Sequence, residues 1–383
     1  MRYKTDFLVS RGRRTAMLTL LGGIVLVLAT AGPSANAVIL IGQSIARSGS
    51  LAPQGEAIVK GTLAYVNRIN ASGGVNGERI ALKTLDDEGD AKRTVENARL
   101  LIGEGAVALF GMIEGGPCTA LLPVITEAKI PLVACMAGSP QLRDPLNRYV
   151  FPVRAAHLDE FASLLSTAAG LGNKTVALIH SDSETGRLHL ANVTRLAKQR
   201  GMEVVLPISV SGKPDVKAIA KQLVASNVDV VLNHGSYSSY AELIRETRAL
   251  GPRPLFLAVN SGGQELARLA GSVSKGTIMS QIAPFPNSRG TSVQRTYEDD
   301  LKKSFPGEPF GWSSMEGYLS AVVLVEGLKR AGKRVTREGL VTAFEKTGRF
   351  DLGGYEVRYG PNDRTGSTFV DITLIKADGT FVR

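Results

Sequence analysis

The chain has 383 residues, of which 44% are apolar and 21% are charged, with a formal net charge of +10. This composition is typical of a folded globular protein and excludes a disordered chain, and the length favours two domains over one. The basic residues form no cluster with interleaved aromatic residues, so we expect no nucleic-acid partner.

The first 37 residues have the layout of a cleavable secretory signal peptide. Five basic residues precede an uncharged run at 15–37, which ends in Ala35-Asn36-Ala37, a fitting cleavage site. An uncleaved membrane anchor is the alternative, but the apolar part, 17–31, is shorter than the roughly 20 residues that span a bilayer. Cleavage removes five basic residues and one acid and leaves a net charge of +6. No cysteine precedes Cys118, so we expect a periplasmic protein without a lipid anchor.

Strands and helices alternate in the first part of the mature chain. Apolar runs predict strands and helical spacing predicts helices, in the order 38–42 (strand), 56–70 (helix), 79–85 (strand), 91–103 (helix), 107–110 (strand), 119–128 (helix) and 130–134 (strand). This order predicts a parallel, doubly wound sheet. Residues 147–154 are expected to be a connecting segment.

A second α/β series follows, and its pattern predicts a second lobe. Its expected helices are 159–169, 187–200, 216–225, 240–250 and 265–270, and its expected strands are 175–180, 203–208, 229–232 and 254–258. Helices at 291–303, 313–331 and 335–346 then come without strands, before a final strand at 368–376. We interpret this helical segment as a return to the first lobe. The expected N-terminal lobe is 38–155 plus about 283–345, and the expected C-terminal lobe is 156–282 plus about 346–383.

Small-residue turns follow the expected strands in both lobes. They are Gly115-Gly116, Ala137-Gly138-Ser139, 181–185, 236–239 and 260–263. At the carboxyl edge of a parallel sheet, such turns present backbone N–H groups that can hold a carboxylate. The pattern therefore favours a binding cleft between the lobes, although Gly/Ser turns also occur in α/β proteins that have no ligand there.

Enzyme and metal motifs are missing from the sequence. We find no dinucleotide fingerprint, phosphate-binding loop or nucleophile elbow. The four histidines are His157, His180, His189 and His234. His180 ends an expected strand and His234 closely follows another, so both could point into the cleft, but neither has the local spacing of a metal or triad site, and we expect neutral, hydrogen-bonded structural roles. Asp86-Asp87 is interpreted as a turn cap, because consecutive strand residues face opposite sides. We expect no metal and no cofactor.

The two cysteines, Cys118 and Cys135, are expected at the same edge of the first sheet. An exported chain meets an oxidising compartment, so a disulfide between them is one interpretation. Two buried thiols are the other.

Several segments resemble one known family. They are IGQSIARSGSLAPQGEAIVKGTLAYVNRINASGGVNGERIAL (41–82), LDDEGDAKRTVENARLLI (85–102), LPVITEAKIPLV (122–133), 149–154 and 312–328. Across the mature chain the sequence is similar to the type I periplasmic solute-binding proteins of the leucine/isoleucine/valine-binding class, the extracytoplasmic receptors of ABC importers. The resemblance implies an α/β fold of two Rossmann-like lobes, joined by three crossovers and closing on a ligand by a hinge.

The resemblance also implies which positions bind the ligand. In the first lobe they are Gln54, Gly115, Gly116, Met136, Ala137, Gly138 and Ser139, and in the second lobe Thr185, Ser236, Tyr237 and Asn260. Gln54 takes the place of an aromatic residue and Ala137 that of a hydroxyl residue. The implied partners are a small solute and the permease subunits of the importer, and the protein is expected to be a monomer.

Asn260 is the main departure from the family pattern. Amino-acid binders carry a carboxylate at this position, and a buried ammonium left unpaired costs several kcal/mol. Either Asp182, Glu184 or Asp159 substitutes, or the ligand is an amide, a small carboxylate or an aromatic acid rather than a simple α-amino acid.

The sequence favours a transport receptor that captures a small amino-acid-like or carboxylate solute and turns nothing over. A sensor with the same fold is the first alternative. The second is an exported hydrolase that uses Ser236 or His234, which the missing nucleophile elbow disfavours.

Overall fold

The computed structural model describes residues 38–252, 254–260 and 263–383. The expected signal peptide at 1–37 lies outside the described residues. Within these ranges the strands form three sheets of five, seven and three strands. No helix in the described part of the chain is long and apolar enough to cross a bilayer.

The first lobe contains a five-stranded parallel sheet in the order β2-β1-β3-β4-β5. Its elements are β1 (Val38–Ile45), α1 (Ala52–Ala71), β2 (Arg79–Asp86), α2 (Ala91–Gly103), β3 (Ala108–Phe110), α3 (Gly115–Ala120), α4 (Leu122–Ala128), β4 (Leu132–Val133) and β5 (Val150–Phe151). The single helix expected at 119–128 is instead two short helices, because Pro123 has no backbone N–H to continue the first. β5 lies in the segment that we expected to be a connection.

The second lobe contains the seven-stranded sheet, in the order β15-β14-β10-β9-β8-β6-β7. Its elements are α5 (His157–Gly170), β6 (Thr175–Ser181), α6 (Glu184–Lys198), β7 (Glu203–Val210), α7 (Val216–Ser226), β8 (Val230–His234), α8 (Tyr237–Leu250), β9 (Leu255–Ala258), α9 (Gly263–Ala270), β10 (Ile278–Gln281), β14 (Asp371–Ile375) and β15 (Phe381–Val382). Strands β6 to β10 are parallel, and β14 and β15 extend the sheet in antiparallel fashion.

Three helices after β10 return to the first lobe, as the sequence predicts. They are α10 (Ser292–Ser304), α11 (Trp312–Arg330) and α12 (Arg337–Thr347). Helix α11 packs directly on α1, because glycines let the two backbones meet. A Cβ atom on Gly61 would lie 1.9 Å from the carbonyl oxygen of Ser314, and one on Gly317 would lie 2.3 Å from that of Ile58. Any larger residue at either position would separate the helices.

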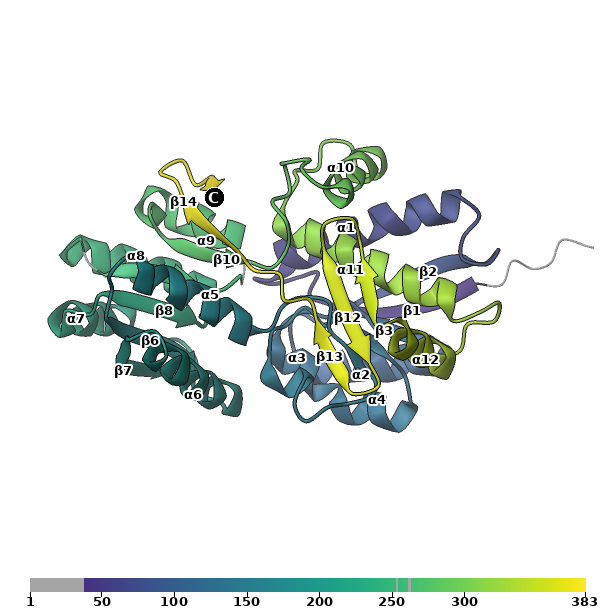
Figure 1. The fold of residues 1–383 in the computed structure, drawn as a ribbon, viewed down its shortest axis with the longest axis horizontal. Helices are drawn as coiled ribbons and strands as arrows, with labels where there is room; N and C mark the ends of the chain where they lie inside the picture. Colours follow the sequence, from purple (N-terminus) through teal and green to yellow (C-terminus); the bar gives the residue numbers. More distant parts are fainter. Residues whose placement is uncertain (1–37, 253, 261–262) are drawn as a thin grey trace, which may run out of the picture. The chain divides into compact units, whose positions relative to one another are not determined.

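The expected boundary near residue 346 is wrong. Strands β11 (Arg349–Asp351), β12 (Glu356–Gly360) and β13 (Asp363–Gly366) form a small antiparallel sheet, and its aromatic side chains are buried in the first-lobe core. Tyr359 packs edge-on against Phe151 of β5, with ring centroids 5.3 Å apart, and its hydroxyl donates to the Pro152 carbonyl. Of the yellow segment in Figure 1, only β14 and β15 pair with the second-lobe sheet. The chain thus passes between the lobes three times, at 152–156, 282–291 and 367–370.

Candidate functional site

Two turns of the first lobe lie side by side at the carboxyl edge of its sheet. The N–H group of Met136, after β4, donates to the carbonyl of Met112, after β3, over 2.7 Å, and Ile113 bridges to Met136. A Cβ atom on Gly115 would lie 2.5 Å from the hydroxyl oxygen of Ser139. The structure therefore brings together the predicted positions Gly115, Gly116, Met136, Ala137, Gly138 and Ser139.

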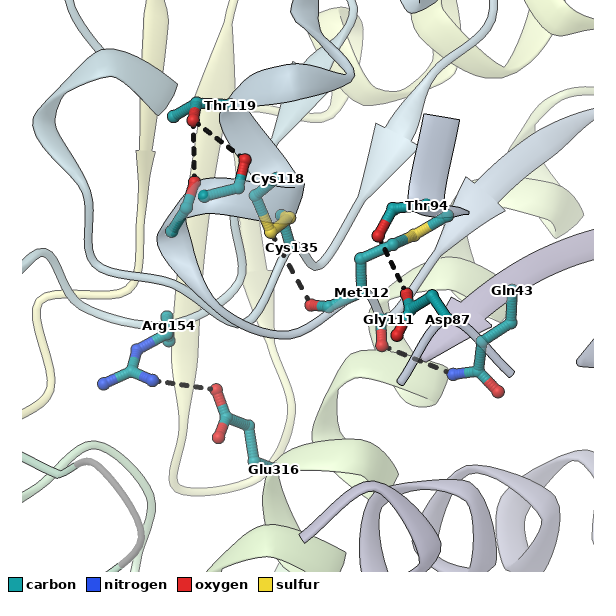
Figure 2. Close-up of a disulfide and its surroundings, with 12 residues drawn as sticks. Gln43, Asp87, Thr94, Gly111, Met112, Cys118, Thr119, Cys135, Arg154 and Glu316 are labelled. Atoms are coloured by element: carbon teal, nitrogen blue, oxygen red, sulfur yellow. Dashed lines mark hydrogen bonds and ion pairs between the residues drawn. A yellow bond between two sulfur atoms is a disulfide. The ribbon is translucent and has the colours of Figure 1, made fainter. Parts of the chain in front are cut away.

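A disulfide fixes these two turns to each other (Figure 2). Cys118 of α3 and Cys135, just after β4, are bonded, and their Cα atoms are 6.1 Å apart. Both residues are buried. Closing a loop with a sequence separation of 17 residues stabilises the fold by about 3 kcal/mol through chain entropy. The bonded pair was one of the two alternatives left open by the sequence.

Glu114, directly before the Gly115-Gly116 turn, is an acidic group that the sequence analysis missed. Its backbone has φ 69° and ψ 145°, a conformation that non-glycine residues rarely adopt and that is often found at binding sites. Burial raises the pKa of the Glu114 carboxyl, and the positive charge of Arg154 acts in the opposite direction. Burial raises the pKa of Tyr237, and the negative charges of Glu265 and Glu114 add to that shift.

Two hydrogen bonds join the lobes near these turns. The hydroxyl of Tyr237, the first residue of α8, donates to the Ser50 carbonyl over 2.8 Å. The side-chain amide of Gln141 donates to the Thr185 hydroxyl, also over 2.8 Å. The predicted positions Thr185 and Tyr237 therefore meet the first lobe.

Two further predicted binding positions, Ser236 and Gln54, take no part in the contacts described above. The hydroxyl of Ser236 pairs with that of Ser238 at 2.7 Å, and Ser236 is exposed. Gln54 lies half-buried in the first turn of α1.

Asn260 is held inside a polar network by contacts that engage its side chain. Its backbone N–H donates to a carboxylate oxygen of Glu160 over 2.7 Å, and its side-chain amide donates to Gln281 of β10. The residue is only 9% exposed. The side chain is thus bound to its own lobe, which argues against a free role in ligand binding.

The three acids that we considered as substitutes for Asn260 are also placed by the structure. Asp159 accepts from the Ala156 N–H and caps α5. The side chain of Asp182 is 63% exposed and lies 3.9 Å from Arg187, and Glu184 is exposed. Glu114, unlike these three acids, directly precedes the Gly115-Gly116 turn.

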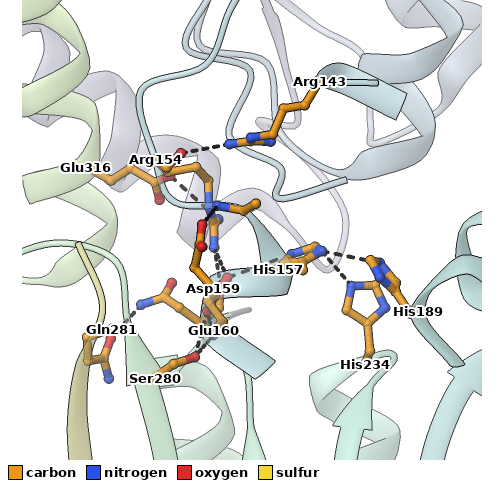
Figure 3. Close-up of polar contacts among 12 residues, drawn as sticks. Arg143, Arg154, His157, Asp159, Glu160, His189, His234, Ser280, Gln281 and Glu316 are labelled. Atoms are coloured by element: carbon orange, nitrogen blue, oxygen red, sulfur yellow. Dashed lines mark hydrogen bonds and ion pairs between the residues drawn. The ribbon is translucent and has the colours of Figure 1, made fainter. Parts of the chain in front are cut away.

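A buried charge network occupies the first crossover (Figure 3). Arg154, 4% exposed, lies 2.9 Å from Glu160 of α5 and 3.6 Å from Glu316 of α11. Burial raises the pKa of Glu316, and Arg154 counteracts the shift. Breaking a buried pair of this kind costs about 3–5 kcal/mol, so the network ties α11 of the first lobe to α5 of the second.

Three of the four histidines meet in space. The Nδ1 atom of His157 lies 2.9 Å from Nε2 of His234 and 3.4 Å from Nε2 of His189. Burial lowers the pKa of all three, to about 2 for His189 and about 4 for His234, so the rings are neutral at neutral pH. Neutral rings agree with the expectation of structural histidines, but the sequence analysis did not predict that these three meet. His157 is 32 residues from His189 and 77 residues from His234 in the sequence, so no local spacing could have revealed the cluster.

Comparison with known proteins agrees with this architecture. The family model described as periplasmic binding protein matches residues 38–380. Leu/Ile/Val-binding protein homolog 3 of Brucella melitensis biotype 1 is 27% identical over 313 residues, which cover 78% of this chain and 81% of that protein. Leu/Ile/Val-binding protein BraC3 of Rhizobium johnstonii is 26% identical over 345 residues, covering 88% and 92%. The crystal structure of a possible leucine/isoleucine/valine-binding protein from Rhodopirellula baltica has a TM-score of 0.84 at 25% identity, covering 91% of this chain and 96% of that one.

Proposed function

The chain belongs to the periplasmic binding protein family, and from this we propose that it is the receptor of an ABC importer, binding a small solute between its lobes. One observation carries the proposal. The two disulfide-linked turns of the first lobe lie at the carboxyl edge of its sheet, and Tyr237 and Thr185 of the second lobe are hydrogen-bonded to the first lobe. The protein acts in the periplasm as a monomer and delivers the solute to permease subunits. Its family consists of solute-binding proteins, so we assign no reaction to it.

The first-lobe turns suit a carboxylate. The N–H groups of Gly115 and Gly116 lie in the first turn of α3, where N–H groups have no acceptor within the helix. Ser139 adds a hydroxyl next to Gly115. These donors would hold an anionic oxygen without a full countercharge, because each charge-assisted hydrogen bond is stronger than a neutral one.

The negative charge of Glu114 would allow the site to bind a zwitterion as well as a simple carboxylate. Glu114 is adjacent in sequence to the proposed carboxylate-binding turn, and its charge adds to the raised pKa of Tyr237, which is mainly due to burial. The ammonium and carboxylate groups of an α-amino acid are only one carbon apart, so neighbouring residues can hold both. We therefore favour an amino-acid-like solute whose ammonium pairs with Glu114 rather than with position 260. Amides and other carboxylates are the alternatives.

A thermal-shift and calorimetry screen of the mature protein tests this function. The solutes are branched-chain amino acids, aliphatic amides, dicarboxylates and aromatic acids. A binder at 100 times its Kd stabilises the fold by about 2.7 kcal/mol, which is a measurable shift in Tm. If no solute in these classes binds, the receptor assignment is wrong.

Glu114→Gln separates the ligand classes. The variant keeps the size of the side chain and removes its charge, so it should weaken the binding of a zwitterion and leave that of a neutral amide unchanged. Glu184→Gln, at an exposed position of the second lobe, is the matched control. Equal loss for zwitterion and amide would contradict the role of Glu114.

A further inference from the structure

The histidine cluster comprises His157, His189 and His234, which belong to three different elements of the second lobe. His157 is the first residue of α5, His189 lies in α6, and His234 is the last residue of β8. His157 and His189 are 8% and 1% exposed, and His234 is half-buried. From each ring one nitrogen converges on the same point, and all three lie within 4.8 Å of one another. Figure 3 shows the ring of His157 directed toward the other two.

From this convergence we infer that the histidine cluster is a binding site for a divalent transition-metal ion, with zinc as the ion that the geometry fits best. The inference concerns a metal site only and stands independently of which solute the cleft binds.

Hydrogen bonding among the rings alone does not account for the arrangement. The Nδ1 atom of His157 is within reach of two Nε2 atoms, at 2.9 and 3.4 Å. A neutral imidazole nitrogen has either one proton to donate or one lone pair to accept with. It can therefore form one strong hydrogen bond, and the other contact, at 3.4 Å, is left with a weak, shared one. A cation accepts the lone pairs of all three nitrogens at once.

Two of the three distances between the ring nitrogens fit a tetrahedral ion, and all three nitrogens lie within 4.8 Å of one another. Zinc–nitrogen bonds of about 2.0–2.1 Å at tetrahedral angles place neighbouring nitrogens about 3.3 Å apart. The two measured separations, 2.9 and 3.4 Å, lie on either side of that value. Imidazole nitrogens suit zinc, copper and nickel, and three histidines with an open fourth position are a known zinc arrangement.

A buried carboxylate lies behind the ring of His157. The Nε2 atom of His157, on the far side of the ring from the convergence point, lies 4.0 Å from a carboxylate oxygen of Glu160. Glu160 is itself held by Arg154 at 2.9 Å and by the Ser280 hydroxyl at 2.6 Å. A carboxylate that accepts a hydrogen bond from a metal-binding histidine fixes the orientation of the ring, and at 4.0 Å Glu160 lies beyond hydrogen-bond distance but on the side of the ring where such a partner is found.

The cluster also lies against the first lobe. The His157 N–H donates to the Gly138 carbonyl over 3.0 Å, and a Cβ atom on Gly138 would lie 2.4 Å from the His157 ring. No fourth histidine, cysteine, aspartate or glutamate of the described residues joins the cluster. Water or another small donor would therefore complete the coordination of the ion.

Zinc titration of the mature, untagged protein tests the site without any solute. The protein is treated with a chelator, desalted and titrated with zinc chloride by calorimetry, and cobalt(II) is added separately to record its visible absorption. We expect one zinc per chain and the intense absorption of four-coordinate cobalt. His189→Gln and His234→Gln should each weaken zinc binding more than tenfold, whereas His180→Gln should not. His180 is the matched control because it is a buried histidine outside the cluster.

The inference is overturned if the wild-type protein takes up no zinc, or if His189→Gln and His234→Gln bind zinc as tightly as His180→Gln does. Circular dichroism verifies that each variant folds. If His189→Gln does not fold, the half-buried His234→Gln and the cobalt spectrum of the wild type still decide the question. Because no solute is present, failure here leaves the proposed receptor function untouched, and success does not depend on it.

Discussion

Tyr237→Phe removes one hydroxyl and keeps the aromatic ring, so it isolates the hydrogen bond that links α8 to the first lobe. That bond joins the Tyr237 hydroxyl to the Ser50 carbonyl at 2.8 Å. A hydrogen bond of this kind contributes about 0.5–1.5 kcal/mol net, and the half-buried position of Tyr237 favours the lower part of the range because water competes. We take about 0.5–1 kcal/mol, which corresponds to a shift of about two- to fivefold in the equilibrium between joined and separated lobes.

Small-angle X-ray scattering of the solute-free protein and calorimetry with a solute found by screening measure this shift. Tyr237→Phe should increase the population with separated lobes and raise the solute Kd by the same two- to fivefold, mainly through faster dissociation. Tyr240→Phe is the matched control. It makes the same change three residues later in α8, where the hydroxyl donates to the Val231 and Leu257 carbonyls inside the second lobe.

The control should lower Tm without changing the scattering profile or the Kd. The reasoning is refuted if Tyr237→Phe and Tyr240→Phe change the Kd equally, or if the scattering of Tyr237→Phe is the same as that of the wild type.

Three other substitutions have defined outcomes. Gly138→Ala would place a methyl group 2.4 Å from the ring and 2.5 Å from the backbone nitrogen of His157, so urea unfolding should show a loss of about 1–3 kcal/mol or more. Glu114→Gln should raise the free energy of unfolding at pH 7 and leave it unchanged near pH 4. The reason is that a raised carboxyl pKa penalises the folded wild type only as the pH rises through the folded-state pKa. Asn260→Asp loses the amide donor to Gln281, so it should lower stability by about 1–3 kcal/mol and bring no gain in affinity for branched-chain amino acids.

A control variant or a contrary measurement tests each of these three substitutions. Gly116→Ala is the control for Gly138→Ala, because a Cβ atom there meets nothing within 4 Å. A stability difference for Glu114→Gln that grows toward acid pH would show that the sign of the pKa shift is wrong. Tighter binding of leucine or valine by Asn260→Asp, measured by calorimetry, would show that position 260 belongs to the binding site.

The sequence alone determined many of the elements and the general architecture, because the signals for both are local. The helix expected at 91–103 is found with those bounds, and the Asp90 carboxylate caps it by accepting from the Arg93 N–H. The alternation of strands and helices predicted the parallel sheets, and small residues after β3 and β4 marked the turns that meet at the sheet edge. These signals are hydrophobic periodicity, helix caps and turn residues. Each depends on residues only a few positions apart, so it can be recognised in the sequence.

Only the tertiary structure decided which distant side chains meet. The short strands β11 to β13 contain charged residues, and the sequence analysis did not predict them. They bury Phe350 and Tyr359 in the first lobe. Asn260 is one of the predicted binding positions, yet packing of β9 beside β10 turns its amide toward Gln281. The convergence of His157, His189 and His234 from three separate elements had no counterpart in local spacing. These contacts depend on how whole elements pack against one another, and that information is distributed over the chain rather than carried by any short segment.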